Sequence, residues 1–411
     1  MTATALQQEE HLPEAIVCKW CGKSFHYLKS HISMGRCENI PESAKGLDVD
    51  EVVKMYTSAF PDEPTISRTA LAKLNEKRAE KHSGEGKVAE ISAHPGYAGT
   101  VEYKTELVAA HELLGVTIKE LGTPRGKPLQ VTVNVNTPYP EFVPEAKKNY
   151  VYGDFDLIKD IFMMLEIGIP GYLWGHAGTG KSSLPTQLCA LLNRPLIRAQ
   201  HTASMEEAHV TGQILARDGS TYFEPGLLAL AMKNGWVYLA DEYDFAFPQI
   251  LGVYQPVLEG KPLIIKEATP DWRRITPHKR FAFIGTGNTN GSGDETGLYQ
   301  GTNIQNAANF SRFGIVSNVK YMSTKAEVNM LAEAGVIREY AEKMVKFANL
   351  VREGYEQHLI SQPIGPRELL LSAKIGMMRG DFSAGIEKSF INKLPSTSAQ
   401  AAREVVQKIF G

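Results

Sequence analysis

The chain has 411 residues, of which 43% are hydrophobic and 22% charged, and its formal net charge at pH 7 is −2. This length predicts roughly two or three domains, with enough apolar side chains to bury a sizeable core. The small net charge excludes a molecule whose whole surface binds nucleic acid. No apolar run approaches the roughly 18 residues of a membrane span, and the N-terminus lacks the pattern of a secretion signal. We therefore expect a cytoplasmic protein without membrane contact.

Three of the four cysteines lie within the first forty residues. With one histidine they follow the spacing C-x₂-C-x₉-H-x₅-C, which is typical of a tetrahedral zinc site. Phe25 and Leu28 supply the small apolar core that such a finger needs. His26 is the alternative to His31 as the third ligand, but His31 fits the register of Phe25 and Leu28 better. The predicted zinc ligands are Cys18, Cys21, His31 and Cys37.

The run from Cys21 to His31 resembles the Ros/MucR type of bacterial zinc finger, and we assign residues 1–45 to this module. Its purpose stays open between two alternatives. A mildly basic surface is compatible with DNA contact, whereas the modest number of basic residues favours docking to a protein at least as well. The basic residues are Lys19, Lys23, Lys29 and Arg36.

Residues 46–128 are expected to form a linker and an N-terminal helical region. The pattern predicts a short helix over 51–56. It also predicts a polar, solvated helix over 73–90 that fades into a linker. A further helix is expected over 105–121, followed by an alternating strand over 129–135.

From about residue 150 helices and strands alternate, which predicts an α/β fold with a parallel sheet covered by helices on both faces. The expected strands cover 172–174, 196–199, 236–240 and 280–285, and the expected helices cover 155–167, 184–192, 227–233 and 250–258. After Tyr321 the pattern is helical, over 324–334, 336–356, 366–380 and 398–409. We therefore assign 129–322 to a large α/β subdomain and 323–411 to a helical subdomain.

A phosphate-binding loop, G-x-x-x-x-G-K-[ST], lies between the first of these strands and the helix that follows it. Its glycines allow several backbone N–H groups to point at one anion, and the helix adds its positive N-terminus. Lys181 is expected to reach the β- and γ-phosphates of ATP, and Ser182 to bind Mg²⁺. The loop residues are Gly175, His176, Ala177, Gly178, Thr179, Gly180, Lys181, Ser182 and Ser183.

Two later strands also end in polar side chains. The strand over 236–240 is followed by Asp241 and Glu242; in nucleotide hydrolases of this design the first carboxylate helps to hold Mg²⁺ and the second orients the attacking water. The strand over 280–285 leads to Asn288, which either contacts the γ-phosphate or its water or caps a turn.

Two arginines complete the candidate catalytic set. Arg312 lies beside aromatic residues between the α/β and helical regions, where it can enter a neighbouring subunit's site and stabilise transition-state charge. Arg367 starts a helix and is expected to reach the phosphates of its own subunit.

These elements, in this order, resemble the AAA+ ATPases, and more narrowly the MoxR-like group. Within that group the chain is most similar to CobS-type ATPase subunits of aerobic cobaltochelatases, over roughly residues 130–325. The resemblance rests on Asp241 to Asp244, Pro248, Val257 to Glu259, Gly293 to Thr302 and Arg312.

The resemblance implies a ring of subunits, usually six, with ATP at each interface and a helical lid after residue 322. It also implies two hairpin insertions, which we place at 213–224 and within 260–279. The usual partner of the group carries a von Willebrand A-like domain. The leading hypothesis is therefore an ATPase that remodels a protein partner and docks through its zinc finger. The alternatives are a cobaltochelatase subunit and an ATPase tethered to DNA.

Overall fold

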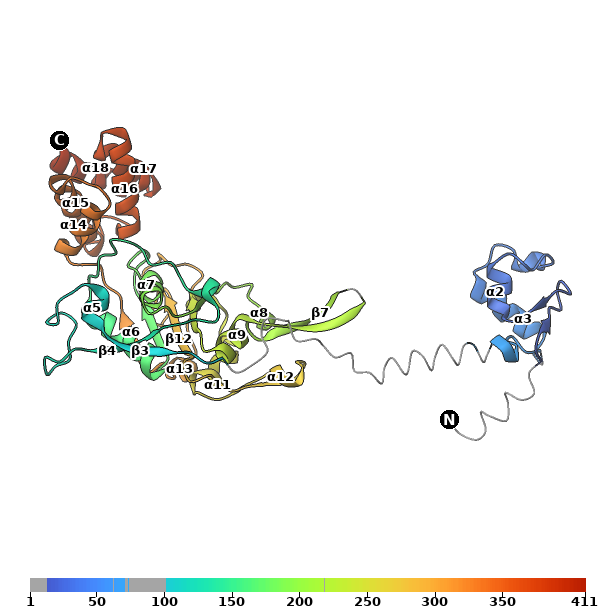
Figure 1. The fold of residues 1–411 in the computed structure, drawn as a ribbon. Coiled ribbons are helices and arrows are strands. Elements are labelled where there is room, and N and C mark those ends of the chain that lie inside the picture. Colours follow the sequence, from blue (N-terminus) through green and yellow to red (C-terminus); the bar gives the residue numbers. More distant parts are fainter. Residues whose placement is uncertain (1–12, 62, 71–72, 74–100, 218) are drawn as a thin grey trace. The chain divides into compact units, whose positions relative to one another are not determined.

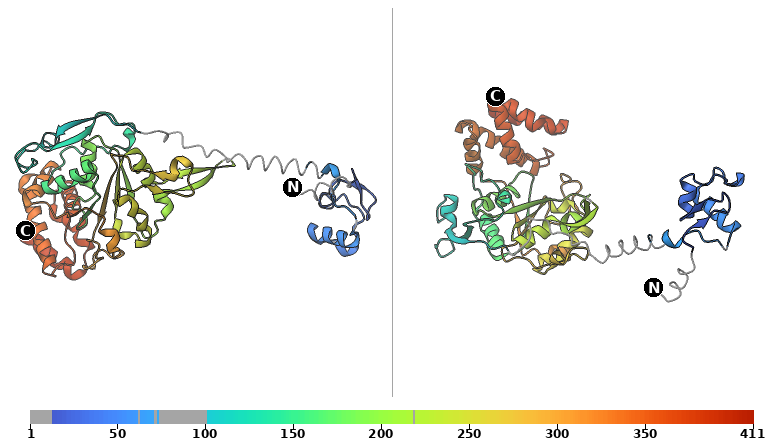
Figure 2. Two further views of the ribbon diagram at one scale, coloured as in Figure 1. Left: turned by 90° about the horizontal axis from the view of Figure 1, so that it is seen from below. Right: turned by 45° about the vertical axis from the view of Figure 1, so that its right-hand side comes forward.

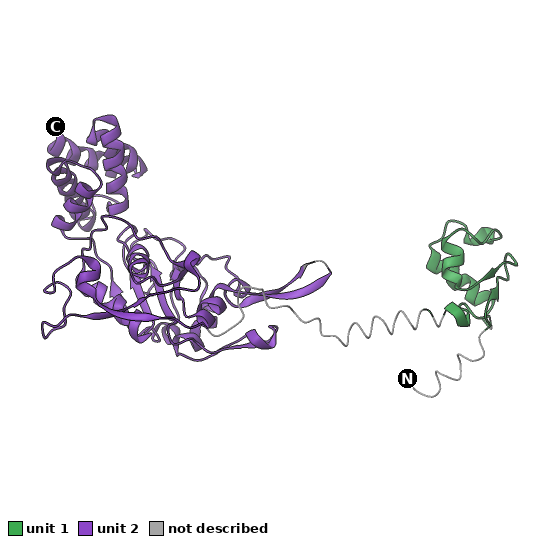
Figure 3. Cartoon of the chain, in the orientation of Figure 1, with its two compact units in different colours: residues 1–91 green, residues 92–411 purple. Residues whose placement is uncertain are grey.

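The computed structural model describes residues 13–61, 63–70, 73, 101–217 and 219–411. The chain divides into two compact units, Met1–Ile91 and Ser92–Gly411 (Figure 3). The polar helix expected over 73–90 lies outside the described residues, apart from Lys73. Within the described segments, no helix is both long and apolar enough to cross a bilayer.

The first unit is a small ββα finger with an additional helix packed against it. The two short strands pair antiparallel, with Ile16 opposite Phe25. Tyr56 from the additional helix is fully buried in the same apolar core, and its hydroxyl accepts a hydrogen bond from the Lys19 backbone N–H at 3.0 Å. The helix expected at 51–56 is thus confirmed and belongs to the folded finger unit. The elements are β1 (Ile16–Val17), β2 (Ser24–Phe25), α2 (Leu28–Ser33), η1 (Glu42–Ala44) and α3 (Val49–Ala59).

The second unit is built on a five-stranded parallel sheet with the order β13-β5-β12-β9-β6 (Figures 1 and 2). Its strands are β5 (Gly171–Trp174), β6 (Leu196–Gln200), β9 (Val237–Asp241), β12 (Ala282–Gly287) and β13 (Ile315–Asn318). Every residue of β9 is buried, because the central strands of such a sheet are covered on both faces. The α/β fold expected from the alternating pattern is confirmed.

Helices flank this sheet. Helix α6 packs against β12 and β13, and α9 packs against β6 and β9. Asp154 caps the N-terminus of α6 through its carboxylate, and the left-handed Gly168 ends the helix. The flanking helices are α6 (Phe155–Ile167), α7 (Ser183–Leu191), α8 (Glu207–Thr211) and α9 (Leu227–Asn234). Shorter elements connect them to the rest: η2 (Pro140–Phe142), η3 (Tyr243–Phe245), α10 (Pro248–Leu251), η4 (Gly252–Tyr254), α11 (Gln255–Leu258) and α13 (Ala307–Phe310).

One expected helix, over 105–121, is wrong in its first and last parts. Residues Thr105–Ala109 form β3, which pairs antiparallel with β4 (Gln130–Asn134), and only Ala110–Leu114 is helical, as α5. The leucines that gave the helical spacing do not share one buried face, since Leu107 is 70% exposed whereas Leu114 is buried. Pairing with β4, a partner distant in sequence, decides the conformation of 105–109.

Both expected hairpin insertions are present. The first consists of β7 (Gly212–Arg217) and β8 (Ser220–Pro225), paired antiparallel over their full length. The second pairs β10 (Leu263–Ile264) with β11 (Arg274–Ile275) and carries α12 (Pro270–Arg273). In Figure 1 the labels β7 and α12 mark the two insertions, which project from the body of the sheet.

The C-terminal region is a helical bundle with its own apolar core. An ion pair inside it joins Arg352 to Glu327, a glutamate with no solvent exposure, through two hydrogen bonds of 2.8 Å. The expected helices are confirmed, and the structure adds α17, which the pattern did not predict. The elements are α14 (Thr324–Glu333), α15 (Arg338–Glu356), α16 (Pro366–Arg379), α17 (Phe382–Ser389), η5 (Ile391–Lys393) and α18 (Ser396–Phe410).

Candidate functional site

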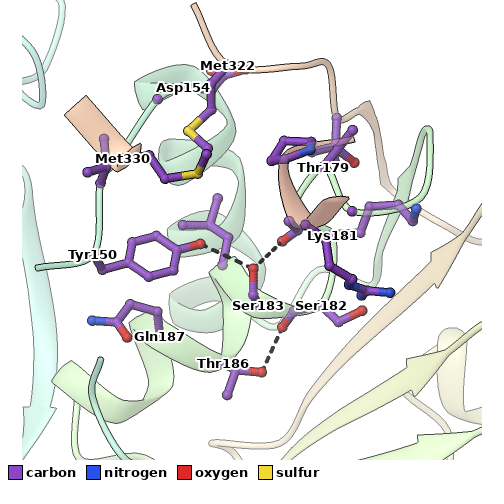
Figure 4. Close-up of a pocket in the computed structure, with 18 of the residues that line it drawn as sticks. Tyr150, Asp154, Thr179, Lys181, Ser182, Ser183, Thr186, Gln187, Met322 and Met330 are labelled. Carbon is purple, nitrogen blue, oxygen red and sulfur yellow. Dashed lines mark hydrogen bonds between the residues drawn. The ribbon is translucent and has the colours of Figure 1, made fainter. Parts of the chain in front are cut away.

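A cavity of about 1180 Å³ opens where the parallel strands β5, β9 and β12 end and the C-terminal helical region begins. Ligands of open parallel sheets bind at this edge, beyond the carboxyl ends of the strands. Figure 4 shows part of its lining, with Lys181, Ser182 and Ser183 on one side and Tyr150, Met322 and Met330 on another. The candidate site residues among the lining are Ala177 to Ser183, Asp241, Glu242, Asn288 and Arg367.

The phosphate loop takes the curled shape that its glycines permit. Gly175 has a φ of +147°, and a Cβ there would lie 2.4 Å from the Val319 carbonyl oxygen, so a larger residue does not fit. Gly178 and Gly180 also have positive φ. Both line the cavity, but Gly175 and His176 do not.

Lys181 is held inside this loop by neutral acceptors. Its Nζ donates to the Gly175 carbonyl at 2.7 Å, to the His176 carbonyl at 2.9 Å and to Asn288 Oδ1 at 3.1 Å. Burial lowers the pKa of Lys181 to about 8, despite nearby carboxylates that raise it. A phosphate anion would give this partly buried ammonium a charged hydrogen-bond partner in place of the neutral acceptors, so the loop fits a nucleoside triphosphate.

Asp241 brings three elements of the site together. Its carboxylate accepts hydrogen bonds from Ser182 Oγ, Thr286 Oγ1 and the Arg198 guanidinium, whose Nε lies 2.7 Å away. Burial opposes ionisation, but these hydrogen bonds and the charge of Arg198 outweigh it and lower the pKa of Asp241. The Ser182 hydroxyl and an ionised carboxylate in contact form the oxygen donor set that Mg²⁺ takes in such sites.

Glu242 follows directly and also faces the cavity. Its backbone is left-handed, with a φ of +53°, a conformation that costs energy for a residue with a side chain. Burial, followed by the charges of Asp241 and Asp244, raises the pKa of Glu242. A carboxylate with a raised pKa is a better proton acceptor, which suits a residue that activates water.

A fully buried carboxylate, Asp244, fixes the end of β12. Its Oδ2 accepts from the backbone N–H of Asn288 at 2.8 Å, and from the backbone N–H and hydroxyl of Thr289 at 2.9 and 3.0 Å. The backbone of Asn288 is therefore tied to the segment that follows Glu242, while its side chain faces Lys181. The sequence pattern did not indicate this role of Asp244.

The two candidate arginines occupy different places. Arg367 lies in the first turn of α16 and lines the cavity. It packs close to the phosphate loop, since a Cβ added to Gly178 would lie 3.3 Å from the Cβ of Arg367. Arg312 follows α13, lies outside the cavity lining, and its Nε is 2.6 Å from Glu259 Oε1. Of these two candidates, Arg367 alone lines the cavity.

Arg198 and Gln200, at the end of β6, were missed by sequence reasoning. Arg198 binds Asp241, and the Gln200 amide donates to the Glu242 carboxylate. Their position could have indicated a site role, because they lie at the carboxyl end of a predicted parallel strand. Asp241 and Glu242 lie at the same edge of the sheet.

In the first unit, the four proposed zinc ligands converge. Their ligand atoms all lie within 4.8 Å of one another, with Cys18 Sγ 3.8 Å from Cys37 Sγ and Cys21 Sγ 3.3 Å from His31 Nε2. The alternative ligand, His26, instead places its Nδ1 3.0 Å from the Ser67 hydroxyl. Three thiols and an imidazole in this arrangement fit a tetrahedral Zn²⁺.

Three of the four basic side chains noted in the finger sequence face acidic partners. The ammonium of Lys19 lies 2.7 Å from Glu63, that of Lys29 lies 2.5 Å from Asp50, and Lys23 pairs with Glu38. These carboxylates offset the charge of three lysines that would otherwise be available to a DNA backbone.

Comparisons with known proteins agree with this geometry. Residues 172–302 match the model of the AAA domain, dynein-related subfamily. Aerobic cobaltochelatase subunit CobS of Sinorhizobium sp. is 32% identical over 249 residues, which cover 58% of this chain and 74% of that protein. An uncharacterized protein of Staphylococcus aureus is 23% identical over 265 residues, 62% of this chain and 96% of that protein.

Among solved structures, the RuvB Holliday junction branch migration motor of Thermotoga maritima matches 65% of this chain and 72% of its own, with 13% identity and a TM-score of 0.37.

Proposed function

Because the chain belongs to the family of AAA+ ATPases that includes CobS, we propose that it hydrolyses ATP in a ring of subunits and thereby remodels a protein partner. One observation carries the catalytic part of this proposal. A single cavity collects a partly buried lysine that donates to neutral acceptors among the described residues, a serine in contact with an ionised aspartate, and a glutamate with a raised pKa. These are the groups that ATP hydrolysis requires.

In this proposal Lys181 and the loop amides bind the β- and γ-phosphates, while Ser182 and Asp241 hold Mg²⁺. The metal ion would supply positive charge that neutralises the phosphates. Glu242 accepts a proton from the attacking water, and Asn288 contacts the γ-phosphate or that water. Arg367, on the first turn of α16, contacts the phosphates from the lid side.

Lys181→Ala should weaken ATP binding strongly, because it removes the only cation seated inside the loop among the described residues. We expect the affinity to fall roughly 10- to 100-fold, the range for a lost hydrogen bond to a charged group. Isothermal titration with Mg²⁺ and ATP measures this. The control is Lys343→Ala, an exposed lid lysine paired with Glu339. Equal affinities in both variants would contradict the phosphate-binding role.

We further propose that the subunits form a ring, usually of six, with Arg312 reaching the nucleotide of the neighbouring subunit. Arg312 lies outside the cavity of its own subunit, and its side chain is 25% exposed. The two hairpins, β7–β8 and β10–β11, are the segments that we assign to the pore or to a partner, with a von Willebrand A-like protein as the candidate. The large α/β and lid subdomains keep the boundaries 129–322 and 323–411 in this proposal.

A second candidate function is that of an ATPase subunit in a cobaltochelatase complex. The 32% identity to CobS favours it. The test adds the purified chain to the other chelatase subunits in place of their own ATPase and measures ATP-dependent cobalt insertion into a corrin. Insertion would support this function, whereas none, with ATP hydrolysis intact, would favour another client.

We also propose that the first unit holds one Zn²⁺ through Cys18, Cys21, His31 and Cys37 and docks the ATPase to a protein. Support comes from the convergence of the four ligand atoms. The pairing of its lysines with carboxylates favours a protein partner over DNA. If the finger instead bound DNA, retention on DNA would fall steeply with salt and would require Cys18 and Cys21.

Two histidine variants test the zinc assignment in the full chain. His31→Ala should release the metal, because structural zinc of this kind contributes on the order of 10 kcal/mol only with its full ligand set. His26→Ala should retain it, since His26 contacts Ser67 and not the cluster. Metal analysis of the purified proteins should give one zinc per chain for the wild type and the His26 variant. Absence of stoichiometric zinc in the wild type would contradict the site.

A further inference from the structure

The segment Gly293–Thr302 contains a tyrosine that contacts the phosphate loop. Tyr299 places its hydroxyl 2.9 Å from His176 Nδ1 and accepts a hydrogen bond from the Ala177 backbone N–H at 3.1 Å. The roles described above for Lys181, Asp241, Glu242 and the arginines leave this contact without a function. Tyr299 is separated from the loop by more than a hundred residues, so the contact depends on the fold.

Asp294 builds the turn that presents Tyr299. One carboxylate oxygen accepts from the backbone N–H and the hydroxyl of Thr296, both at 2.9 Å, and the other accepts from the Tyr299 backbone N–H at 2.7 Å. Gly297 has a φ of +74° within this turn. Hydrogen bonds within the turn therefore hold the Tyr299 backbone independently of its contacts with the phosphate loop.

The same segment is anchored to η3, the turn that follows Asp241 and Glu242. The Asn303 backbone N–H donates to the Asp244 carbonyl at 2.7 Å, and its side-chain amide donates to the Phe245 carbonyl at 3.1 Å. Residues 294–303 therefore connect the segment after Glu242 to the tip of the phosphate loop.

The imidazole of His176 is confined by aromatic rings. It stacks on Tyr321 with ring centroids 5.8 Å apart and an interplanar angle of 4°, and the ring of Tyr355 is perpendicular to it, with centroids 5.9 Å apart. Since the Tyr299 hydroxyl already accepts the Ala177 N–H, its own proton is free to be donated to His176 Nδ1. Burial lowers the pKa of His176, which agrees with a neutral ring that accepts this proton.

We propose that Tyr299 is a positioning residue that holds His176 and Ala177 so that the phosphate loop is set for the terminal phosphates of ATP. This inference rests on the proposed ATPase function. The His176 carbonyl, on the residue that Tyr299 holds, also accepts from Lys181 Nζ at 2.9 Å. Because Lys181 reaches the β- and γ-phosphates, a shift of His176 should affect a triphosphate more than a diphosphate.

The test compares Tyr299→Phe with Tyr340→Phe, which removes the same hydroxyl from a lid tyrosine stacked on Phe382, away from the cavity. Both are made in a Glu242→Gln background so that bound ATP persists, and affinities for Mg-ATP and Mg-ADP are measured by calorimetry. Tyr299→Phe should weaken ATP binding roughly tenfold and ADP binding much less, while Tyr340→Phe changes neither. The melting temperature without nucleotide should be the same in both.

His176→Phe provides a second measurement, because it keeps an aromatic ring against Tyr321 but removes the acceptor nitrogen. Its effect on ATP affinity should not add to that of Tyr299→Phe, since both remove one shared hydrogen bond. Three outcomes would each overturn the role of Tyr299. The effects of Tyr299→Phe and His176→Phe could be additive, or Tyr299→Phe could leave the ATP affinity unchanged. Tyr299→Phe could also weaken ATP and ADP binding equally and lower the melting temperature. Failure of the parent Glu242→Gln protein to bind ATP would instead contradict the proposed function itself.

Discussion

Glu242→Gln should abolish most ATP hydrolysis and leave ATP binding nearly unchanged. The amide keeps the shape of the side chain but cannot accept a proton from water as a carboxylate does. General-base catalysis contributes roughly 10²–10⁴ in rate, so a loss of that size is expected. Its amide oxygen can still accept from the Gln200 amide, which now donates to the carboxylate, and this preserves the local structure. Phosphate release and nucleotide titration measure the two quantities separately.

The matched control is Glu339→Gln, the same change at an exposed lid residue that is paired with Lys343. It should hydrolyse ATP at the wild-type rate. Near-normal turnover in Glu242→Gln would show that another group activates the water. If Glu242→Gln lost ATP binding together with hydrolysis, Glu242 would maintain the structure of the cavity and would not activate the water.

Much of the nucleotide site could be predicted from the sequence because its signals are local. The glycines, Lys181 and Ser182 lie within one loop, and the strand before them and the helix after them have clear periodicity. Asp241 and Glu242 likewise follow a continuous apolar strand, which the structure shows as fully buried β9. In a parallel α/β sheet, the polar residues of a site can be recognised because they directly follow an apolar strand.

Contacts between distant segments could not be predicted in the same way. Arg198 reaches Asp241 only because β6 and β9 are neighbours in the sheet, a fact of strand order that periodicity does not encode. The conformation of 105–109 depends on pairing with β4, so the helical spacing between Leu107 and the later leucines was misleading. Tyr299 lies in a glycine-rich segment without regular structure, where only the folded chain shows its partner.

The zinc cluster could be predicted from the sequence only in part. Cysteine spacing predicted three ligands directly, whereas the choice between His26 and His31 depended on the register of a short helix. In the structure α2 turns the ring of His31 towards the thiols, and His26, before the helix, faces Ser67. The folding of α3 onto the finger was outside what the spacing could indicate, because Tyr56 reaches the core from a separate helix.

Arg312→Ala should leave ATP binding nearly intact and reduce hydrolysis steeply, because we place this arginine in the active site of the adjacent subunit. Arginine fingers in related phosphoryl transfer contribute roughly 10³–10⁵ in rate. In the single subunit the guanidinium is held by Glu259 at 2.6 Å, outside the cavity of its own chain. Loss of the side chain should therefore not disturb the nucleotide contacts made by Lys181.

Mixing two inactive variants, Glu242→Gln and Arg312→Ala, decides whether the site is shared. In a mixed ring, some interfaces pair an intact Glu242 from one subunit with an intact Arg312 from its neighbour, so part of the hydrolysis should return. The control mixture combines Glu242→Gln with Lys181→Ala; both changes lie on the nucleotide side of the interface, so no interface regains a complete set. If mixed rings form and the first mixture stays as inactive as the control, Arg312 does not act across the interface. A chain that remains monomeric with saturating ATP would remove the shared site altogether, and the loss in Arg312→Ala would then have to arise through Glu259 and the segment that carries it.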